Sequence, residues 1–309
     1  MNVNAISSIN FQGKKLSKAE KAERKAERKA NRKQTGKAFL ASNGVQVATA
    51  PITLALAKKM CNYSKTLTPE QIAQTNAGID QVLNSVSELG KKGVKIIDFK
   101  EKLTNPTKLP DRIYGAFDSL FATANGDNAF FSNTDKMKNF GIDKNSVVIN
   151  REKLPLAAFH ELGHAHNFNA SKIMRALQNV RMPAIAIASV LALIPALTKE
   201  EVAKEGEELT KAQKFKNKFR KACPALAGLS MMPIVAEEAV ATIKGNGWAK
   251  QVLTKDLAKK VAKANGVALC TYVITAAAMA LGGYVALKVK DAKNKKQNNQ
   301  SQIYATHQG

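Results

Sequence analysis

Cysteine is scarce in this chain, and its spacing excludes two kinds of site. The three cysteines, Cys61, Cys223 and Cys270, lie far apart, and no C-x-x-C pair occurs. Neither a disulfide framework nor a zinc site built from cysteines is therefore indicated. We expect all three to be ordinary buried residues.

We expect no secretory leader from the first residues of the sequence. Residues 1–37 are polar, and no short apolar core follows Met1, so no cleavable signal peptide is evident. We therefore expect any insertion into a membrane to use internal segments of the chain.

The usual features of nucleic-acid-binding proteins are missing as well. Aromatic residues make up 6% of the chain and do not alternate with its basic residues. No known nucleic-acid-binding module is present either. Binding to nucleic acid would rest on net charge alone, so we expect no nucleic-acid partner.

Negative charge is in short supply. The chain has 48 Lys and Arg against 24 Asp and Glu, a formal net charge of +24. Eleven basic residues fall between Lys14 and Lys37 and five between Lys288 and Lys296, and each cluster adjoins an uncharged apolar stretch. Such an excess is typical of proteins that bind nucleic acid or anionic membranes, and this distribution favours the membrane.

Four apolar stretches are candidates for membrane contact. Residues 38–57 and 266–287 carry no charge and are long enough to cross a bilayer. The second is the better candidate, whereas the first contains polar residues and would also suit the membrane interface or packing against protein. Residues 182–197 and 222–236 are shorter and interrupted by prolines. They predict either a short membrane hairpin or a pair of buried core helices.

These patterns divide the chain into seven segments. Our predicted segments are a basic tail (1–37), an apolar segment and candidate membrane helix (38–59), a core that contains the sequence H-E-x-x-H (60–181), a hydrophobic helical hairpin with a charged loop (182–236), a helix that carries two adjacent glutamates, with a basic region (237–265), a transmembrane helix (266–288) and a basic, polar tail (289–309).

The most specific pattern is H-E-x-x-H, at residues 160–164. Positions i and i+4 of a helix share one face, so His160 and His164 can bind the same Zn²⁺ while Glu161 reaches a metal-bound water. Pro155 suits the first turn of such a helix, and the apolar residues around the motif predict that it is half-buried. Without a partner, burying two histidines and a glutamate there would cost free energy.

Two short strands are predicted just before this helix. Asn128-Ala129-Phe130-Phe131 and residues 146–149 are aromatic or β-branched runs separated by polar residues and Gly141. The earlier residues 60–127 are predicted to be mostly helical and contain no motif.

A catalytic zinc takes three protein ligands, so a further one is needed. His166 lies about 200° around the helix from His164, and position 170, where a metzincin has a histidine, is Ala170. A distant carboxylate is the natural ligand. Glu237 and Glu238 follow an apolar run, where unpaired carboxylates are costly, and from these residues alone either one is a candidate.

Residues 128–242 resemble the HtpX-type, CAAX-processing class of membrane-integrated gluzincin peptidases. The shared pattern is an N-A-F strand, an H-E-L-G-H helix, a hydrophobic hairpin and an E-x-x-A helix, in that order. The resemblance implies that Glu238 is the third ligand and that Glu237 faces elsewhere. This chain has Thr242 where the family has an aspartate, which in such sites orients a zinc-binding histidine.

The resemblance also implies a fold and a function. We expect a mainly α protein with a small β-sheet (α+β), in which a zincin-like core is joined to a hydrophobic hairpin and membrane helices. We expect a zinc endopeptidase in which Glu161 activates water, and in which Asn128, Ala129 and Phe130 bind polypeptide substrates as an added strand. His166 and Asn167 are candidates for stabilising the oxyanion, or else cap the helix.

The resembling family implies a multi-pass protein of the bacterial inner or plasma membrane that acts in membrane protein quality control. If residues 38–57 and 266–287 both cross the bilayer, the two basic tails lie on the side opposite the zinc site. Which side is cytoplasmic stays open. The alternative is a membrane scaffold or adaptor that retains the peptidase fold without metal or catalysis.

Overall fold

The computed structural model describes residues 17–100, 114–203 and 206–306 and is mostly helical, with one three-stranded sheet. The α-helices are α1 (Lys18–Lys65), α2 (Pro69–Ser85), α3 (Ser87–Gly90), α4 (Tyr114–Asn125), α5 (Ala158–Ala170), α6 (Lys172–Asn179), α7 (Arg181–Leu197), α8 (Lys211–Ser230), α9 (Met232–Val252) and α10 (Lys255–Thr306). The strands are β1 (Lys95–Asp98), β2 (Phe130–Ser132) and β3 (Ser146–Ile149), and two 3₁₀ turns are η3 (Asp135–Phe140) and η4 (Pro155–Ala157).

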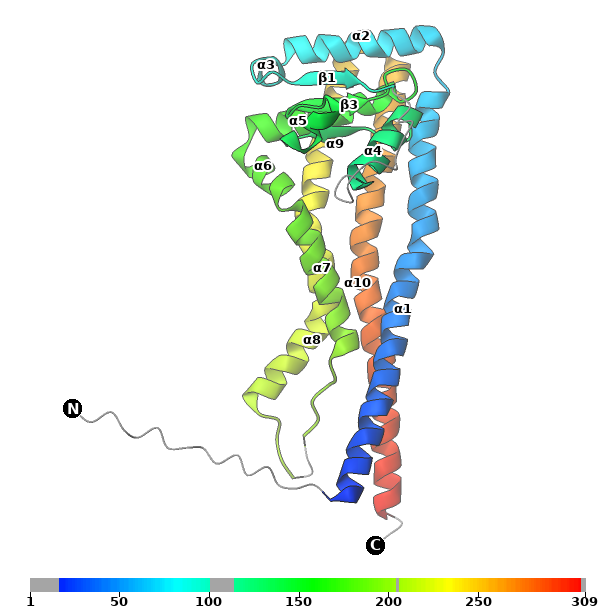
Figure 1. The fold of residues 1–309 in the computed structure, drawn as a ribbon, viewed down its shortest axis with the longest axis vertical. Helices are drawn as coiled ribbons and strands as arrows, with labels where there is room; N and C mark the ends of the chain where they lie inside the picture. The colour runs from blue at the N-terminus through cyan, green and yellow to red at the C-terminus, as the bar shows by residue number, and fades with distance from the viewer. Residues whose placement is uncertain (1–16, 101–113, 204–205, 307–309) are drawn as a thin grey trace, which may run out of the picture.

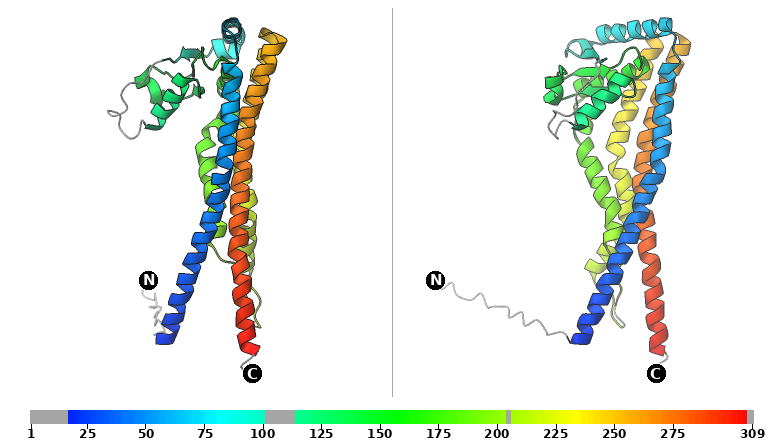
Figure 2. Two further views of the ribbon diagram at one scale, coloured as in Figure 1. Left: turned by 90° about the vertical axis from the view of Figure 1, so that its right-hand side faces the viewer. Right: turned by 45° about the vertical axis from the view of Figure 1, so that its right-hand side comes forward.

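Long helices form a bundle that carries a small globular part at one end (Figure 1). Helices α1 and α10 lie side by side, with α7, α8 and α9 packed against α10. The first turn of α1 and the last turn of α10 both lie at the end of the bundle away from the sheet, where the two helices diverge (Figure 2). The two basic segments therefore lie at one end of the molecule, and the H-E-x-x-H helix lies at the other.

The outer surface of this bundle is apolar. Three helical segments, Arg28–Lys65, Lys211–Val252 and Lys255–Ala292, are long and apolar enough to cross a membrane, and the bent pair of α6 and α7 adds a fourth if it counts as one span. Most of the large apolar side chains that are exposed in the described residues belong to these helices. They include Phe39, Leu40, Val47, Ile52 and Leu54 of α1, Ile187 and Val190 of α7, Leu226 and Leu229 of α8, and Val273 and Leu281 of α10.

One expectation about the cysteines is wrong. Cys61 and Cys223 are buried as expected, but Cys270 is exposed. It lies on the outward side of α10 within the apolar stretch, a surface that suits a small apolar side chain as well as a protein interior would.

Most of the segment boundaries drawn from the sequence lie inside continuous helices: 37/38 and 59/60 in α1, 236/237 in α9, and 265/266 and 288/289 in α10. The basic run and the apolar run that follows it form the single helix α1, because no helix-breaking residue separates them and Pro51 is accommodated within it. The apolar residues 222–236 are shared between α8 and α9, which meet at Met231. The predicted hairpin is formed by α7 and α8, which pack against each other.

The sheet has the order β1-β3-β2, with β1 parallel and β2 antiparallel to β3. The predictions of strands at β2 and β3 are confirmed. Strand β1 lies in a region predicted to be mostly helical, and only four residues, K-I-I-D, form it. All four residues of β3 are buried, since this strand lies at the centre of the sheet and packs against α5.

Helix α5 is buried along most of its length and touches α9 backbone to backbone. A Cβ atom on Gly163 would lie 2.3 Å from the carbonyl oxygen of Ala241, and one on Gly245 would lie 2.4 Å from that of Phe159. Both distances are far below van der Waals contact, so only glycine fits at these two positions. The two glycines set the separation of the two helices that carry the candidate metal ligands.

We expect Gly163→Ala and Gly245→Ala each to lower the free energy of unfolding by about 1–3 kcal/mol, because the added methyl group must push the two backbones apart. Gly247→Ala is the matched control, since a Cβ on this α9 residue would meet no atom within 4 Å. Thermal unfolding of detergent-solubilised protein measures the difference. Equal stability of the three variants would contradict backbone contact between α5 and α9.

Candidate metal centre

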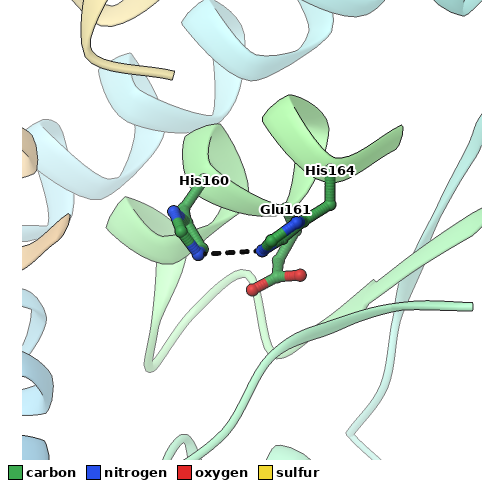
Figure 3. A group of neighbouring side chains, drawn as sticks. All are labelled: His160, Glu161 and His164. Atoms are coloured by element: carbon green, nitrogen blue, oxygen red, sulfur yellow. Dashed lines mark hydrogen bonds between the residues drawn. The ribbon is translucent and has the colours of Figure 1, made fainter. Parts of the chain in front are cut away.

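The two histidines of the motif lie one turn apart on the same face of α5. Their rings meet nearly edge to face, with centroids 4.5 Å apart, and their Nε2 atoms are 3.0 Å apart (Figure 3). His160, Glu161 and His164 are each less than 9% exposed. Three buried polar side chains on adjacent turns of an α-helix need partners.

The partner comes from α9. Glu238 is fully buried, and its Oε2 atom lies 3.1 Å from Nε2 of His160 and 3.4 Å from Nε2 of His164. Three potential ligand atoms therefore form a triangle with sides of 3.0, 3.1 and 3.4 Å. Atoms bound at about 2.0 Å to a tetrahedral Zn²⁺ stand about 3.3 Å apart. The triangle has the size that a metal requires.

Glu161 and Glu237 complete two overlapping groups of metal-binding side chains. The first is His160, Glu161 and His164, and the second is His164, Glu237 and Glu238; in each, the candidate ligand atoms lie within 4.8 Å of one another. All five side chains are buried. These buried groups could hold a metal ion, which would compensate the charge of carboxylates removed from water.

Each histidine has a second partner on its far side. The Nδ1 atom of His160 lies 3.3 Å from the hydroxyl oxygen of Thr242, and Nδ1 of His164 lies 2.9 Å from Oε1 of Glu237. Outer partners of this kind hold a ligand ring in the orientation and tautomer that metal binding needs. The expectation that Glu237 faces elsewhere is wrong. This part of α9 lies against both α5 and α6, so the side chain of Glu237 contacts His164 of α5 and Gln178 of α6.

The sequence did not single out two further residues at this site. Arg181, the first residue of α7, forms an ion pair with Oε1 of Glu238, and its guanidinium group lies 5.2 Å from the ring centre of Tyr272. Tyr272 of α10 and Glu161 both line the same two cavities. A charged residue at the start of an apolar helix and a tyrosine inside an uncharged run were the available signals.

The pKa values of two α5 side chains are displaced. Burial raises the pKa of Glu161, although the nearby His164 and His160 partly oppose this. Burial alone would lower the pKa of His164, but hydrogen bonds to Glu237 and Glu238 outweigh it and hold the pKa well above its ordinary value. A carboxyl group with a raised pKa is suited to give and take protons near neutral pH.

His166 lies away from the metal-binding groups, as its position on the helix predicted. Its Nδ1 atom is 2.8 Å from Nζ of Lys244, and its ring packs against Trp248. Burial and the charge of Lys244 lower its pKa. The residue next to it, Asn167, donates a hydrogen bond to Glu237 and accepts one from Lys244. Both residues have structural partners, and neither lines the cavities at the site.

The predicted substrate strand borders the site. Asn128, Ala129 and Phe130 line a cavity of about 450 Å³ together with Glu161, His164 and Glu238. Strand β2 pairs only with β3 and is an edge of the described sheet. Unpaired backbone groups of an edge strand can bind an extended peptide. The amide group of Asn128 is held by the Ser119 carbonyl oxygen at 3.4 Å.

In comparisons with known proteins, the chain matches no family model, no curated protein and no solved structure.

Substitution of the three triangle residues tests whether they bind metal. We expect purified full-length protein to contain about one metal ion per chain, and His160→Ala, His164→Ala or Glu238→Ala to lose it, because two ligands rarely hold an ion against a chelator. His166→Ala, on the same helix, is the control and should keep the metal. Elemental analysis after dialysis measures the content. Equal metal content in all four variants would exclude this site.

Proposed function

We propose that this chain is a zinc-dependent, membrane-associated endopeptidase that hydrolyses peptide bonds. The observation that carries the proposal is the triangle of Nε2 of His160, Nε2 of His164 and Oε2 of Glu238, with sides of 3.0 to 3.4 Å. Glu161 adjoins His160 on the same buried part of α5, which supports a catalytic site.

The donor set favours zinc in a catalytic role. Two imidazole nitrogens and one carboxylate oxygen form the ligand set of many hydrolytic zinc sites, whereas magnesium and calcium prefer oxygen alone. Structural zinc sites usually have four protein ligands, most often cysteines. Here three ligands would leave a fourth position open towards the cavities beside β2.

Glu161 is the proposed general base and acid. When bound, zinc would lower the pKa of water and polarise the carbonyl of the scissile bond. Glu161, one position along α5 from His160, would accept the proton of the attacking water and then deliver it to the leaving amine. Its burial keeps bulk water away from this proton, and its raised pKa makes the carboxylate a stronger proton acceptor.

The cavity beside β2 is the proposed substrate site. An extended polypeptide would add to the free edge of β2 and present a peptide bond to Glu161 and the two histidines. Backbone hydrogen bonds recognise peptides with little regard to their side chains. Polypeptides with unfolded or extended segments are therefore the proposed substrate class.

The membrane is the proposed location. The exposed apolar surface of α1, α7, α8 and α10 would cost free energy in water and is suited to contact with lipid. Glu238 follows the apolar stretch of α8 and α9, so the site would lie at one end of the membrane-spanning part. The resemblance of residues 128–242 to HtpX-type peptidases supports a role in the quality control of proteins in a bacterial inner or plasma membrane.

A metal-free scaffold or adaptor is the second candidate. It is favoured by the ion pair between Arg181 and Glu238, which compensates this carboxylate without a metal, and by Thr242 in place of the family aspartate. In a scaffold the same residues would hold α5, α7 and α9 together.

Cleavage of casein by detergent-solubilised protein distinguishes the two. We expect the wild-type protein to cleave casein and Glu161→Gln to reduce the rate about 10²–10⁴-fold, because the proton acceptor is lost while all three ligands remain. Glu208→Gln, at an exposed position, is the control for loss of one negative charge. A wild-type protein that carries zinc but leaves casein, or a panel of unfolded proteins, intact would contradict the endopeptidase.

A further inference from the structure

Because position 242 is a threonine, His160 has a neutral outer partner where the resembling family has a carboxylate. The hydroxyl oxygen of Thr242 lies 3.3 Å from Nδ1 of His160, at the place where an aspartate side chain would reach. A neutral hydroxyl group can accept a hydrogen bond from Nδ1–H, but it places no negative charge beside the ring. His160 is therefore oriented by this contact without the charge that makes a ligand more basic.

The other histidine, His164, has a charged outer partner, Glu237. Oε1 of Glu237 lies 2.9 Å from Nδ1 of His164, 3.0 Å from Nδ2 of Asn167 and 2.8 Å from Nε2 of Gln178. Two amide donors and Nδ1 of His164 converge on one oxygen of a side chain that is 2% exposed. An ionised carboxylate satisfies both amides, whereas a protonated one would bring a competing donor of its own.

These contacts favour one tautomer of His164. Because an ionised Glu237 can only accept, the neutral imidazole that metal binding requires would carry its proton on Nδ1 and keep the lone pair of Nε2. That lone pair points towards His160 and Glu238, the other two corners of the triangle. The ring is thereby held in the form that binds metal.

We propose that Glu237 is a positioning residue of the metal centre: it orients His164 and supplies, at position 237, the outer-shell carboxylate that this chain lacks at position 242. The inference rests on the metal site of the proposed function. In the resembling family the carboxylate orients the first histidine of the motif from position 242. In this chain Glu237, about one turn earlier on α9, orients the second histidine, His164.

Two neighbours fix the carboxylate in place. Gln178, near the end of α6, donates its amide to Glu237 and to the carbonyl oxygen of His164, so it joins both partners. Asn167 of α5 donates to Glu237 and accepts from Lys244. The orientation of His164 thus depends on α5, α6 and α9 together, and Gln178 ties it to the bend of 49° between α6 and α7.

Zinc affinity of the full-length protein in detergent tests the proposal without relying on proteolysis. The wild type and variants are titrated with zinc in competition with a chromophoric chelator. We expect Glu237→Gln to weaken zinc binding 10–100-fold, which is typical for loss of an outer-shell carboxylate. Glu237→Asp keeps the charge and should recover part of this loss. Gln178→Ala, at a half-buried position, should weaken binding by a smaller factor and serves if Glu237→Gln does not fold.

Two controls give each result a meaning. Glu88→Gln removes an exposed carboxylate near His166 and should leave zinc affinity unchanged. Glu238→Ala should abolish binding. If Glu238→Ala loses zinc while Glu237→Gln and Gln178→Ala bind it as tightly as wild type, the role of Glu237 is refuted and the metal site stands. If Glu238→Ala also binds as wild type, the metal site and the inference both fall.

Discussion

Backbone contact between α5 and α9 is the constraint on which the rest of the site depends. Gly163 of α5 lies against the backbone of Ala241, and Gly245 of α9 lies against the backbone of Phe159. The two helices run antiparallel, and at each of these two contacts one of them has a glycine. At this separation the short reach of a glutamate on α9 is enough to place its oxygen between two imidazoles on α5. With a larger residue at either glycine, the three corners of the triangle would separate.

The resulting interior is polar and charged, and its parts compensate one another. Three buried carboxylates and two buried imidazoles would destabilise the fold if they were isolated, because each loses its hydration. Here Arg181 forms an ion pair with Glu238, and Asn167 and Gln178 donate hydrogen bonds to Glu237. A divalent cation at the centre would complete this compensation. The site and the stability of the globular part are therefore coupled, since the same contacts serve both.

The sequence was informative where local spacing determines the chemistry. Residues 160–164 predicted one face of a helix, β-branched and aromatic runs predicted β2 and β3, and carboxylates after an apolar run predicted a ligand on α9. Long-range features were not predictable. Strand β1 is only four residues long, and the contacts of Arg181 and Tyr272 depend on how α7 and α10 meet. The partner of Glu237 likewise depends on the rotation of α9 about its axis, which apolar periodicity did not specify.

The ligand environment of the bound metal tests the central claim most directly. X-ray absorption at the zinc edge of the full-length protein should show nitrogen and oxygen neighbours at about 2.0–2.1 Å, with the outer-shell scattering of two imidazoles and no sulfur. Absence of bound zinc, a sulfur neighbour near 2.3 Å, or scattering from fewer than two imidazoles would contradict a site formed by His160, His164 and Glu238.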